Sequence, residues 1–372
     1  MRGFIIPFGS RSLVSIDKKI NLQKNQLATI SDIRETDVSV DVSDRAKVLA
    51  AVLLTGSLPM DYSKAYEEIA EPDFLFIRYA GADRQFVKFL RRIKEKYSQC
   101  KIIVEIPTYP NIKERLLAPV NWLLLPGELL LYRWVIKRYV DRFLIYSDYD
   151  CIYGVPTIKT MNGTDVKKVS PKSDGHRDSI NIIAVAHMQA YDGYERLIDS
   201  LDTYVNNGGM RAVKIYLVGD GPEEERYRSM VKTKGLEDKV FLCGRKTGEE
   251  LNRLYELADI GVDVLGCYKK GMEISPSLKS KEYLAHGLPM IGACEIDVFL
   301  KYDFPYYLKF PNDPSPIDMN DIITFYDRVY KDGTREQVMD SIYEYALDHV
   351  DISQTMKPVL DYIQKACNSE SK

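Results

Sequence analysis

The sequence predicts an α/β protein built from two wound domains of parallel strands. Short apolar runs rich in β-branched and aromatic residues alternate with longer helical patterns, as expected when each strand is followed by a helix. The runs form two series, one in residues 2–146 and one in residues 180–292, and the polar stretch 167–178 separates them. At 372 residues the chain is long enough for two domains that each bury a core.

The first series defines a domain at residues 1–166. Its predicted strands are 2–7, 74–79, 101–106 and 143–146. A glycine-containing segment, Phe8-Gly-Ser-Arg11, follows the first strand, where a loop at the sheet edge is expected. Side chains that follow strand ends, and that are therefore candidates to contact a substrate, are Arg78, Glu105, Thr108 and Glu114.

The linker, the second domain and the last helix complete the predicted organisation. Residues 167–178 contain proline and glycine and show no apolar periodicity, which is typical of a linker. The second domain is predicted at 179–350, and a final helical segment at 351–372. Its predicted strands are 180–186, 213–218, 240–242, 260–264 and 289–292.

Composition restricts the functional classes. Hydrophobic residues make up 45% and charged residues 28% of the chain, and the net charge of −3 gives no general attraction to nucleic acid. The six cysteines form no C-x-x-C pair, so we expect reduced thiols in a cytoplasmic protein. No apolar run reaches the roughly 20 residues that span a bilayer.

Residues 277–292 carry the most informative pattern. Ser277 or Ser280 can cap a helix, Lys279 and Lys281 bring cations to its first turn, and free backbone N–H groups there attract anions. Glu282, one turn further in, can accept hydrogen bonds from two sugar hydroxyls. The alternative is an ordinary α/β crossover whose lysines are solvated.

The same stretch resembles a known family. Glu282, Ala285, Gly287 and Pro289 match the donor-binding block of retaining glycosyltransferases of the GT-B fold, in particular the family-four group and its bacterial surface polysaccharide branch. The resemblance implies two Rossmann-like domains facing a cleft, with the C-terminal helix crossing back to the first domain. It also implies that Glu282 binds the ribose of a nucleotide-sugar.

Other donor-site residues are implied by the same resemblance. Lys279 is then a diphosphate ligand, with Ser277 and Leu278 beside it at the helix start. Arg245 is placed at a strand's carboxyl end, where ligands of open α/β sheets bind. Lys270 or Lys269 either neutralises the leaving diphosphate or is a solvated loop charge.

Some positions match the family poorly. The family's arginine and lysine after the first strand of the second domain are replaced by His187 and Asp192, so Arg196 or the cations of 265–281 are expected to substitute. Ile274 stands where the family has an earlier glutamate, and Glu273 lies one residue away as a possible donor-sugar ligand. The segment Gly219-Asp-Gly-Pro222 reads as a structural turn, because the acids that follow it would repel phosphate.

Two patterns in the first half allow alternative interpretations. Glu105 is either a catalytic acid or a buried, paired one. Asp148-Tyr-Asp150 has the spacing of a metal-binding D-x-D motif, but it follows a strand and more naturally caps a turn.

Residues 113–142 contain Trp122 and Trp134 among leucines, with six Lys or Arg against three Asp or Glu. A basic amphipathic helix with aromatic anchors is typical of proteins that lie on anionic membranes. The alternative is a core helix, favoured because Pro126-Gly127 interrupts the pattern.

Taken with the resemblance, these patterns predict a retaining glycosyltransferase of the cytoplasm, peripheral on the inner membrane face. The donor would be a UDP- or GDP-sugar and the acceptor a glycan or lipid-linked saccharide of a surface polysaccharide. No metal, other cofactor, nucleic acid or protein nucleophile is implied. The alternatives are a nucleotide-sugar epimerase, a sugar phosphorylase and a degenerate GT-B binding subunit.

Overall fold

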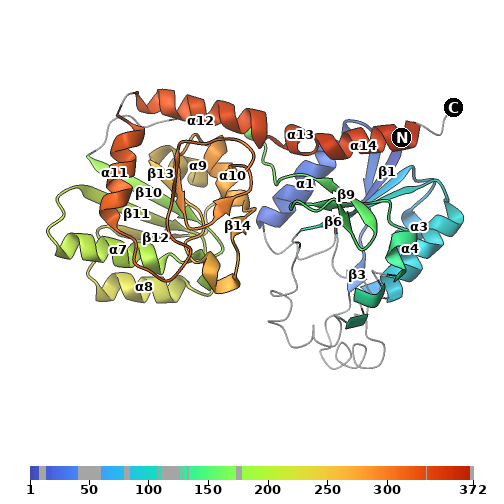
Figure 1. Cartoon of the computed structure of the whole chain (residues 1–372), viewed down its shortest axis with the longest axis horizontal. Helices are drawn as coiled ribbons and strands as arrows, with labels where there is room; N and C mark the ends of the chain where they lie inside the picture. Colours follow the sequence, from blue (N-terminus) through green and yellow to red (C-terminus); the bar gives the residue numbers. More distant parts are fainter. Residues whose placement is uncertain are drawn as a thin grey trace. The chain divides into compact units, whose positions relative to one another are not determined.

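The computed structural model describes residues 1–7, 14–40, 60–78, 84–107, 109, 126–127, 129–131, 134–172, 178–331 and 333–368. The chain forms two compact units (Figure 1). Unit 1 contains Met1–Met161 together with Thr355–Lys372, and unit 2 contains Asn162–Gln354. The predicted segments 8–11 and 113–125, with Thr108, lie outside the described residues.

Unit 1 is organised around a seven-stranded sheet in the order β2-β1-β5-β6-β7-β9-β8, parallel except for β8 against β9. The strands are β1 (Arg2–Ile6), β2 (Asp32–Glu35), β5 (Phe74–Arg78), β6 (Lys101–Ile106), β7 (Arg142–Ile145), β8 (Cys151–Ile152) and β9 (Val155–Lys159). A separate antiparallel pair joins β3 (Ser39–Val40) to β4 (Met60–Asp61). Apolar runs such as Phe74–Ile77 have no exposed surface, as expected for strands covered on both faces.

The helices of unit 1 pack on this sheet through apolar stripes. They are α1 (Val14–Ala28), α3 (Ser63–Glu68), α4 (Arg84–Lys96), the short 3₁₀ helix η1 (Ile136–Arg138) and α14 (Lys357–Asn368). In α4 the buried residues are Phe86, Phe89, Leu90 and Ile93, which lie on one helical face. The last helix, α14, packs near β6 and β9, so the predicted return of the C-terminal helix to the first domain is confirmed (Figure 1).

Unit 2 contains a six-stranded parallel sheet in the order β12-β11-β10-β13-β15-β17. The strands are β10 (Ser179–Val185), β11 (Ala212–Val218), β12 (Val240–Gly244), β13 (Ile260–Val262), β15 (Met290–Gly292) and β17 (Tyr307–Lys309). Numbered along the chain, this is the 3-2-1-4-5-6 order of a Rossmann fold, whose topological switch point lies between β10 and β13. A short parallel pair joins β14 (Ile274–Ser275) to β16 (Glu295–Ile296).

The helices of unit 2 follow the strands as predicted for wound α/β units. They are α7 (Glu195–Asn206), α8 (Glu224–Thr233), α9 (Gly248–Leu257), α10 (Leu278–Ala285), α11 (Met319–Val329), α12 (Arg335–His349) and α13 (Ile352–Thr355). The short 3₁₀ helices are η2 (Val166–Lys168), η3 (Ala190–Asp192) and η4 (Cys267–Lys270). The core packs the strand residues of β10, β11 and β13 against α7 and α11.

Three local predictions meet a definite outcome. Part of the polar stretch at 167–178 is ordered as η2, which Tyr343 ties to unit 2 by donating to the Val166 carbonyl at 3.3 Å. The prediction that all cysteines are reduced is wrong for Cys267 and Cys294, which form a disulfide between η4 and the end of β15. Among the described residues, no helix is both long and apolar enough to cross a bilayer.

Candidate functional site

The start of α10 lies at the switch point of the unit 2 sheet. Ser277 is the helix N-cap, and its hydroxyl accepts from the Ser280 backbone N–H at 3.2 Å and donates to Asp263 Oδ1 at 2.5 Å. Tyr283 fixes the helix from its other side, because its hydroxyl accepts from the Val185 N–H at 2.9 Å and donates to the Val262 carbonyl at 3.0 Å. The helix is therefore tied to both β10 and β13.

Lys279 is held in an ion pair. Its Nζ lies 2.6 Å from Asp192 Oδ1 and donates to the Tyr194 hydroxyl at 3.0 Å. Burial works against the charge of this ammonium group, but the carboxylates of Asp192 and Asp263 outweigh burial and raise the pKa of Lys279. Lys279 is therefore a fixed cation whose charge is largely balanced by Asp192.

The balance around Lys279 is acidic. Asp192 and Asp263 are 2% and 1% exposed, and one lysine stands between two carboxylates. Asp263 Oδ2 is buried and has no hydrogen-bond partner among the described residues. We call Asp192, Asp263 and Lys279 the Lys279 cluster; its formal charge is −1.

Glu282, one turn into α10, is only partly buried. Tyr255 of α9 donates its hydroxyl to Glu282 Oε2 at 3.2 Å, and the Tyr255 ring stacks on His286 with ring centroids 4.0 Å apart. Burial, and then the neighbouring charge of Glu282, raises the pKa of Tyr255 well above its ordinary value, so the hydroxyl remains a donor. The carboxylate is thus oriented on the same helix that carries Lys279.

The loop cations are also engaged. Lys269 donates to the Ala190 carbonyl at 2.8 Å and forms an ion pair with Glu195. Lys270, predicted as a catalytic residue, lies over the Tyr191 ring with its Nζ 3.6 Å from the centroid. Both lysines therefore hold η4 against η3, next to the Lys279 cluster.

Glu273 and Ile274 lie at the exposed edge of the β14–β16 pair. Glu273 is exposed, its carbonyl accepts from the Glu295 N–H at 2.9 Å, and Ile274 is 48% exposed. No contact of the Glu273 side chain places it at the start of α10 within the described part of the chain. Its predicted catalytic role therefore has no geometric support.

The two arginines predicted as donor ligands lie in different surroundings. Arg196 is 6% exposed and donates to the carbonyls of Ser315, at 2.9 and 3.1 Å, Pro311, at 3.3 Å, and Leu265. These bonds brace loops and occupy its guanidinium, which leaves the cations of 265–281 as the alternative substitutes for the phosphate ligands. Arg245 follows β12, as predicted, and is exposed.

The segment that departs most from the family pattern is structural. His187 Nδ1 lies 2.9 Å from Asp220 Oδ1, and the Met188 N–H donates to the Asp220 carbonyl at 2.6 Å. Gly219 has φ +132°, and a Cβ there would lie 1.8 Å from the Ala186 carbonyl oxygen. This close approach explains the glycine of the Gly-Asp-Gly turn.

In unit 1, Glu105 is the centre of a buried group. Its carboxylate lies 2.8 Å from Lys19 Nζ and 3.3 Å from Arg78 Nη1, and it accepts hydrogen bonds from Gln23, at 3.1 Å, and Tyr146. Burial opposes the charge, but the two cations and the hydrogen bonds lower the pKa of Glu105 to about 2. With 0% exposure and two cations beside it, Glu105 has the surroundings of the buried, paired acid, one of the two alternatives that the sequence left open.

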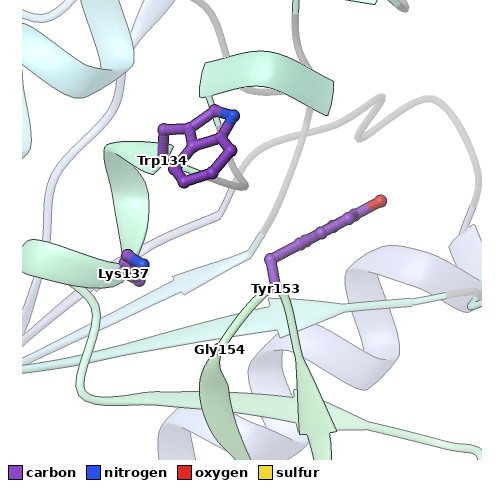
Figure 2. A pocket seen from close by; sticks show the side chains of 4 residues that line it. All are labelled: Trp134, Lys137, Tyr153 and Gly154. Atoms are coloured by element: carbon purple, nitrogen blue, oxygen red, sulfur yellow. The ribbon is translucent and has the colours of Figure 1, made fainter.

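Part of residues 113–142 is described, and it contains short helical pieces. Leu130 and Trp134 are 61% and 58% exposed. Trp134, Lys137, Tyr153 and Gly154 line a mostly apolar pocket of about 410 Å³ (Figure 2).

Among the D-x-D residues, Asp148 and Asp150 both pair with Lys159, at 2.7 and 2.8 Å, which agrees with a turn.

The sequence reasoning missed several residues that shape both sites. Asp263, Lys19, Gln23 and Tyr146 received no role. The available signal was weak: Asp263 is an acid directly after the apolar strand β13. No group of three or more potential metal ligands occurs within the described ranges.

Comparisons with known proteins agree with this architecture. Residues 179–296, from β10 to β16, match the family model described as Glycosyl transferases group 1. No curated protein matches the chain by sequence. The match contains the Lys279 cluster, Tyr255 and Glu282.

Three solved structures are similar over almost the whole chain. Sucrose-phosphate synthase from Thermosynechococcus elongatus has 15% identity and a TM-score of 0.66, covering 98% of this chain and 99% of its own. HepE of Anabaena in complex with UDP has 12% identity and a TM-score of 0.61, covering 98% and 99%. The lipopolysaccharide outer core galactosyltransferase WaaB, in its apo form, has 12% identity and a TM-score of 0.54, covering 100% of both chains.

The two units therefore have the GT-B fold, with two Rossmann-like domains of parallel strands. Identities of this size establish the fold alone. The match to the model described as Glycosyl transferases group 1 lies within the second unit.

Proposed function

We propose that this protein is a glycosyltransferase that uses a nucleotide-sugar donor, with α10 at the centre of the donor site. The observation that carries the proposal is the position of Glu282 and Lys279 on one helix at the switch point of a Rossmann sheet, inside the group 1 match. In such sheets ligands bind at the carboxyl ends of the strands beside the switch point.

The roles follow from the chemistry of each group. Glu282, oriented by Tyr255, accepts hydrogen bonds from the ribose hydroxyls. The backbone N–H groups at Ser277 and Leu278, with Lys279, bind the diphosphate, because a helix N-terminus favours anions. UDP is the preferred nucleotide, since HepE is similar in fold and was solved with UDP; GDP is the alternative.

For the reaction we propose retention of anomeric configuration. Fixed hydrogen-bond donors stabilise the negative charge that develops on the leaving diphosphate. We propose no protein nucleophile. Lys270 is near enough along η4 to contribute a cation if the Tyr191 contact opens. Arg245 is retained as a second, exposed cation of the donor side.

The acceptor we propose is a glycan or lipid-linked saccharide of a surface polysaccharide. The fold likeness to WaaB supports a glycan acceptor. Exposed Leu130 and Trp134 beside Lys137 support contact with an anionic membrane, because an apolar pair next to a cation suits a lipid interface.

Nucleotide binding tests the proposal. Calorimetric titration of the full chain with UDP, GDP and ADP should give affinity for one of the first two, and Glu282→Ala should weaken it at least tenfold, about 1.4 kcal/mol. The matched control is Glu249→Ala on neighbouring α9, where Glu249 is 84% exposed. Absence of nucleotide binding, or equal losses in both variants, would refute the donor site.

One observation favours a second function, a degenerate GT-B binding subunit. Asp192 balances Lys279, and Glu273 is exposed. A subunit of this kind would bind UDP but would neither transfer nor hydrolyse UDP-sugar. Product analysis after incubation with UDP-glucose and UDP-galactose separates such a subunit from an enzyme. Conversion of one of these sugars into the other, by inversion at C4, would identify an epimerase.

A further inference from the structure

The buried charges of unit 1 are unequal in number. Lys19 and Arg78 both pair with one carboxylate, Glu105. Lys19 is 6%, Arg78 9% and Glu105 0% exposed. We call these three, with Gln23 and Tyr146, the Glu105 cluster; with both cations protonated its formal charge is +1.

Arg78 uses little of its hydrogen-bonding capacity. A guanidinium has five N–H donors. One, on Nη1, points to Glu105 Oε2 at 3.3 Å, and no other side-chain hydrogen bond of Arg78 is found among the described residues. The other guanidinium nitrogens of Arg78 are not among the buried side-chain atoms that lack a partner, so they keep some exposed surface and can donate to a ligand.

The cluster lies where the fold predicts a ligand. Along the chain, the main strands β2-β1-β5-β6-β7-β9 have the order 2-1-3-4-5-6, so the switch point lies between β1 and β5. Arg78 is the last residue of β5, and Lys19 is on α1, the helix that follows β1. Glu105 is paired with Arg78 in the register of β6 and β5.

We propose that Lys19 and Arg78 form a binding site for one oxyanion, a phosphodiester or a carboxylate, and that Glu105 positions both cations. A singly charged oxyanion matches the excess of one cation. The planar fork of Arg78 suits two oxygens at once. Gln23 and Tyr146 hold Glu105 in place by donating to Oε1.

The identity of the ligand as the sugar acceptor rests on the function proposed above, but the oxyanion site itself does not. In that setting the oxyanion would belong to the acceptor, either as the phosphate of a lipid-linked saccharide or as the carboxylate of an acidic sugar. Both offer the same chemistry to the cluster.

Binding should favour the protonated form of Lys19. The groups around Lys19 are Glu105 from β6, Arg78 from β5 and Tyr146 after β7. Burial lowers the pKa of Lys19; Glu105 partly reverses this and Arg78 adds to it. An oxyanion beside Lys19 adds a second counter-charge that opposes the effect of burial, whereas Glu105 stays ionised and Tyr146 stays protonated.

Isothermal titration calorimetry of the full chain tests the site. The probes are dimethyl phosphate and glucuronate, both monoanions that do not titrate near pH 8. We expect at least one probe to bind, and Arg78→Gln to weaken binding at least tenfold. The exposed, helix-paired Arg91 provides the control Arg91→Gln, which should bind normally.

The outcomes are decisive in either direction. Failure of both probes to bind, or equal weakening in Arg78→Gln and Arg91→Gln, would overturn the site. If Arg78→Gln does not fold, Lys19→Gln takes its place and should weaken binding in the same way. Preference for dimethyl phosphate or glucuronate identifies the source of the oxyanion. UDP affinity of the unmodified chain and of Glu282→Ala is measured separately. That comparison tests the donor site alone, so failure of the oxyanion site can be distinguished from failure of the donor site.

Discussion

The two units place charged clusters at equivalent points of their sheets but with opposite balance. In unit 1, Glu105 stands between Lys19 and Arg78; in unit 2, Lys279 stands between two carboxylates. In each cluster one charged group lies between two groups of opposite charge. These neighbours lower the pKa of Glu105 and raise the pKa of Lys279, so both groups stay ionised.

The difference indicates what each unit has left to offer a ligand. Unit 1 has spare donors on Arg78, which suit an oxyanion. Unit 2 has a spare acceptor on Asp263 and few uncommitted cations near α10, so backbone N–H groups carry more of the diphosphate's charge than in a site rich in arginine and lysine. The following predictions test this contrast, beginning with the largest effect.

Glu105→Ala should destabilise the protein most. It leaves Lys19 and Arg78 buried without a counter-charge, and breaking a buried pair in this way costs about 3–5 kcal/mol. Urea unfolding measures the loss. The control Glu95→Ala removes a carboxylate paired on the surface of α4 and should cost at most about 1 kcal/mol. Similar losses in the two variants would contradict the buried pairing.

Acid should remove the same contribution from the intact protein. Glu105 has a folded pKa of about 2 against an ordinary value of 4.5, so its stabilisation is complete above the ordinary pKa and is lost as pH falls through about 2. A shift of this size corresponds to about 3 kcal/mol. The difference in unfolding free energy between wild type and Glu105→Gln should shrink over this range; a constant difference would exclude Glu105 as its source.

Asp192→Asn should strengthen UDP binding. The substitution removes a charge that competes with diphosphate for Lys279, while the one amide oxygen of asparagine can still accept from the Gln189 N–H. We expect an increase of about tenfold in affinity, or about 1.4 kcal/mol. Asp199→Asn, on the exposed face of α7, is the control. Weaker binding by Asp192→Asn would mean that the carboxylate positions Lys279 more than it neutralises it.

Tyr255→Phe should have the smallest effect. It removes one hydrogen bond to Glu282, at 3.2 Å, worth about 1 kcal/mol or roughly fivefold in UDP affinity. Tyr330→Phe, whose hydroxyl donates to the Asp259 carbonyl at 3.1 Å, is the control. No change in UDP affinity would remove Tyr255 from the account.

The fold was largely predictable because strand and helix patterns are local. Apolar runs such as 74–79 and 180–186 became buried strands, and Ser277 with Gly287 marked the limits of α10 closely. Pairings between distant residues were not predictable. Lys279 meets Asp192 across 87 positions, and Gln23 meets Glu105 across 82, so no periodicity records them.

The same reason explains the errors in the site. Arg196 was predicted as a substitute for the missing cations, but carbonyls near 265 and 311–315 occupy it. Cys267 and Cys294 belong to no motif; the fold brings the start of η4 next to the residues that follow β15. Roles that depend on folded neighbours need the structure.

Hydrogen exchange of the full chain with saturating UDP tests the central claim most directly. If the donor site lies at α10, UDP should slow amide exchange at residues 277–285 by at least tenfold, with no comparable protection at Arg78 or Glu105. Glu282→Ala should remove the protection at matched nucleotide concentration. Protection by UDP at the Glu105 cluster with none at 277–285 would contradict the assignment of the nucleotide to unit 2.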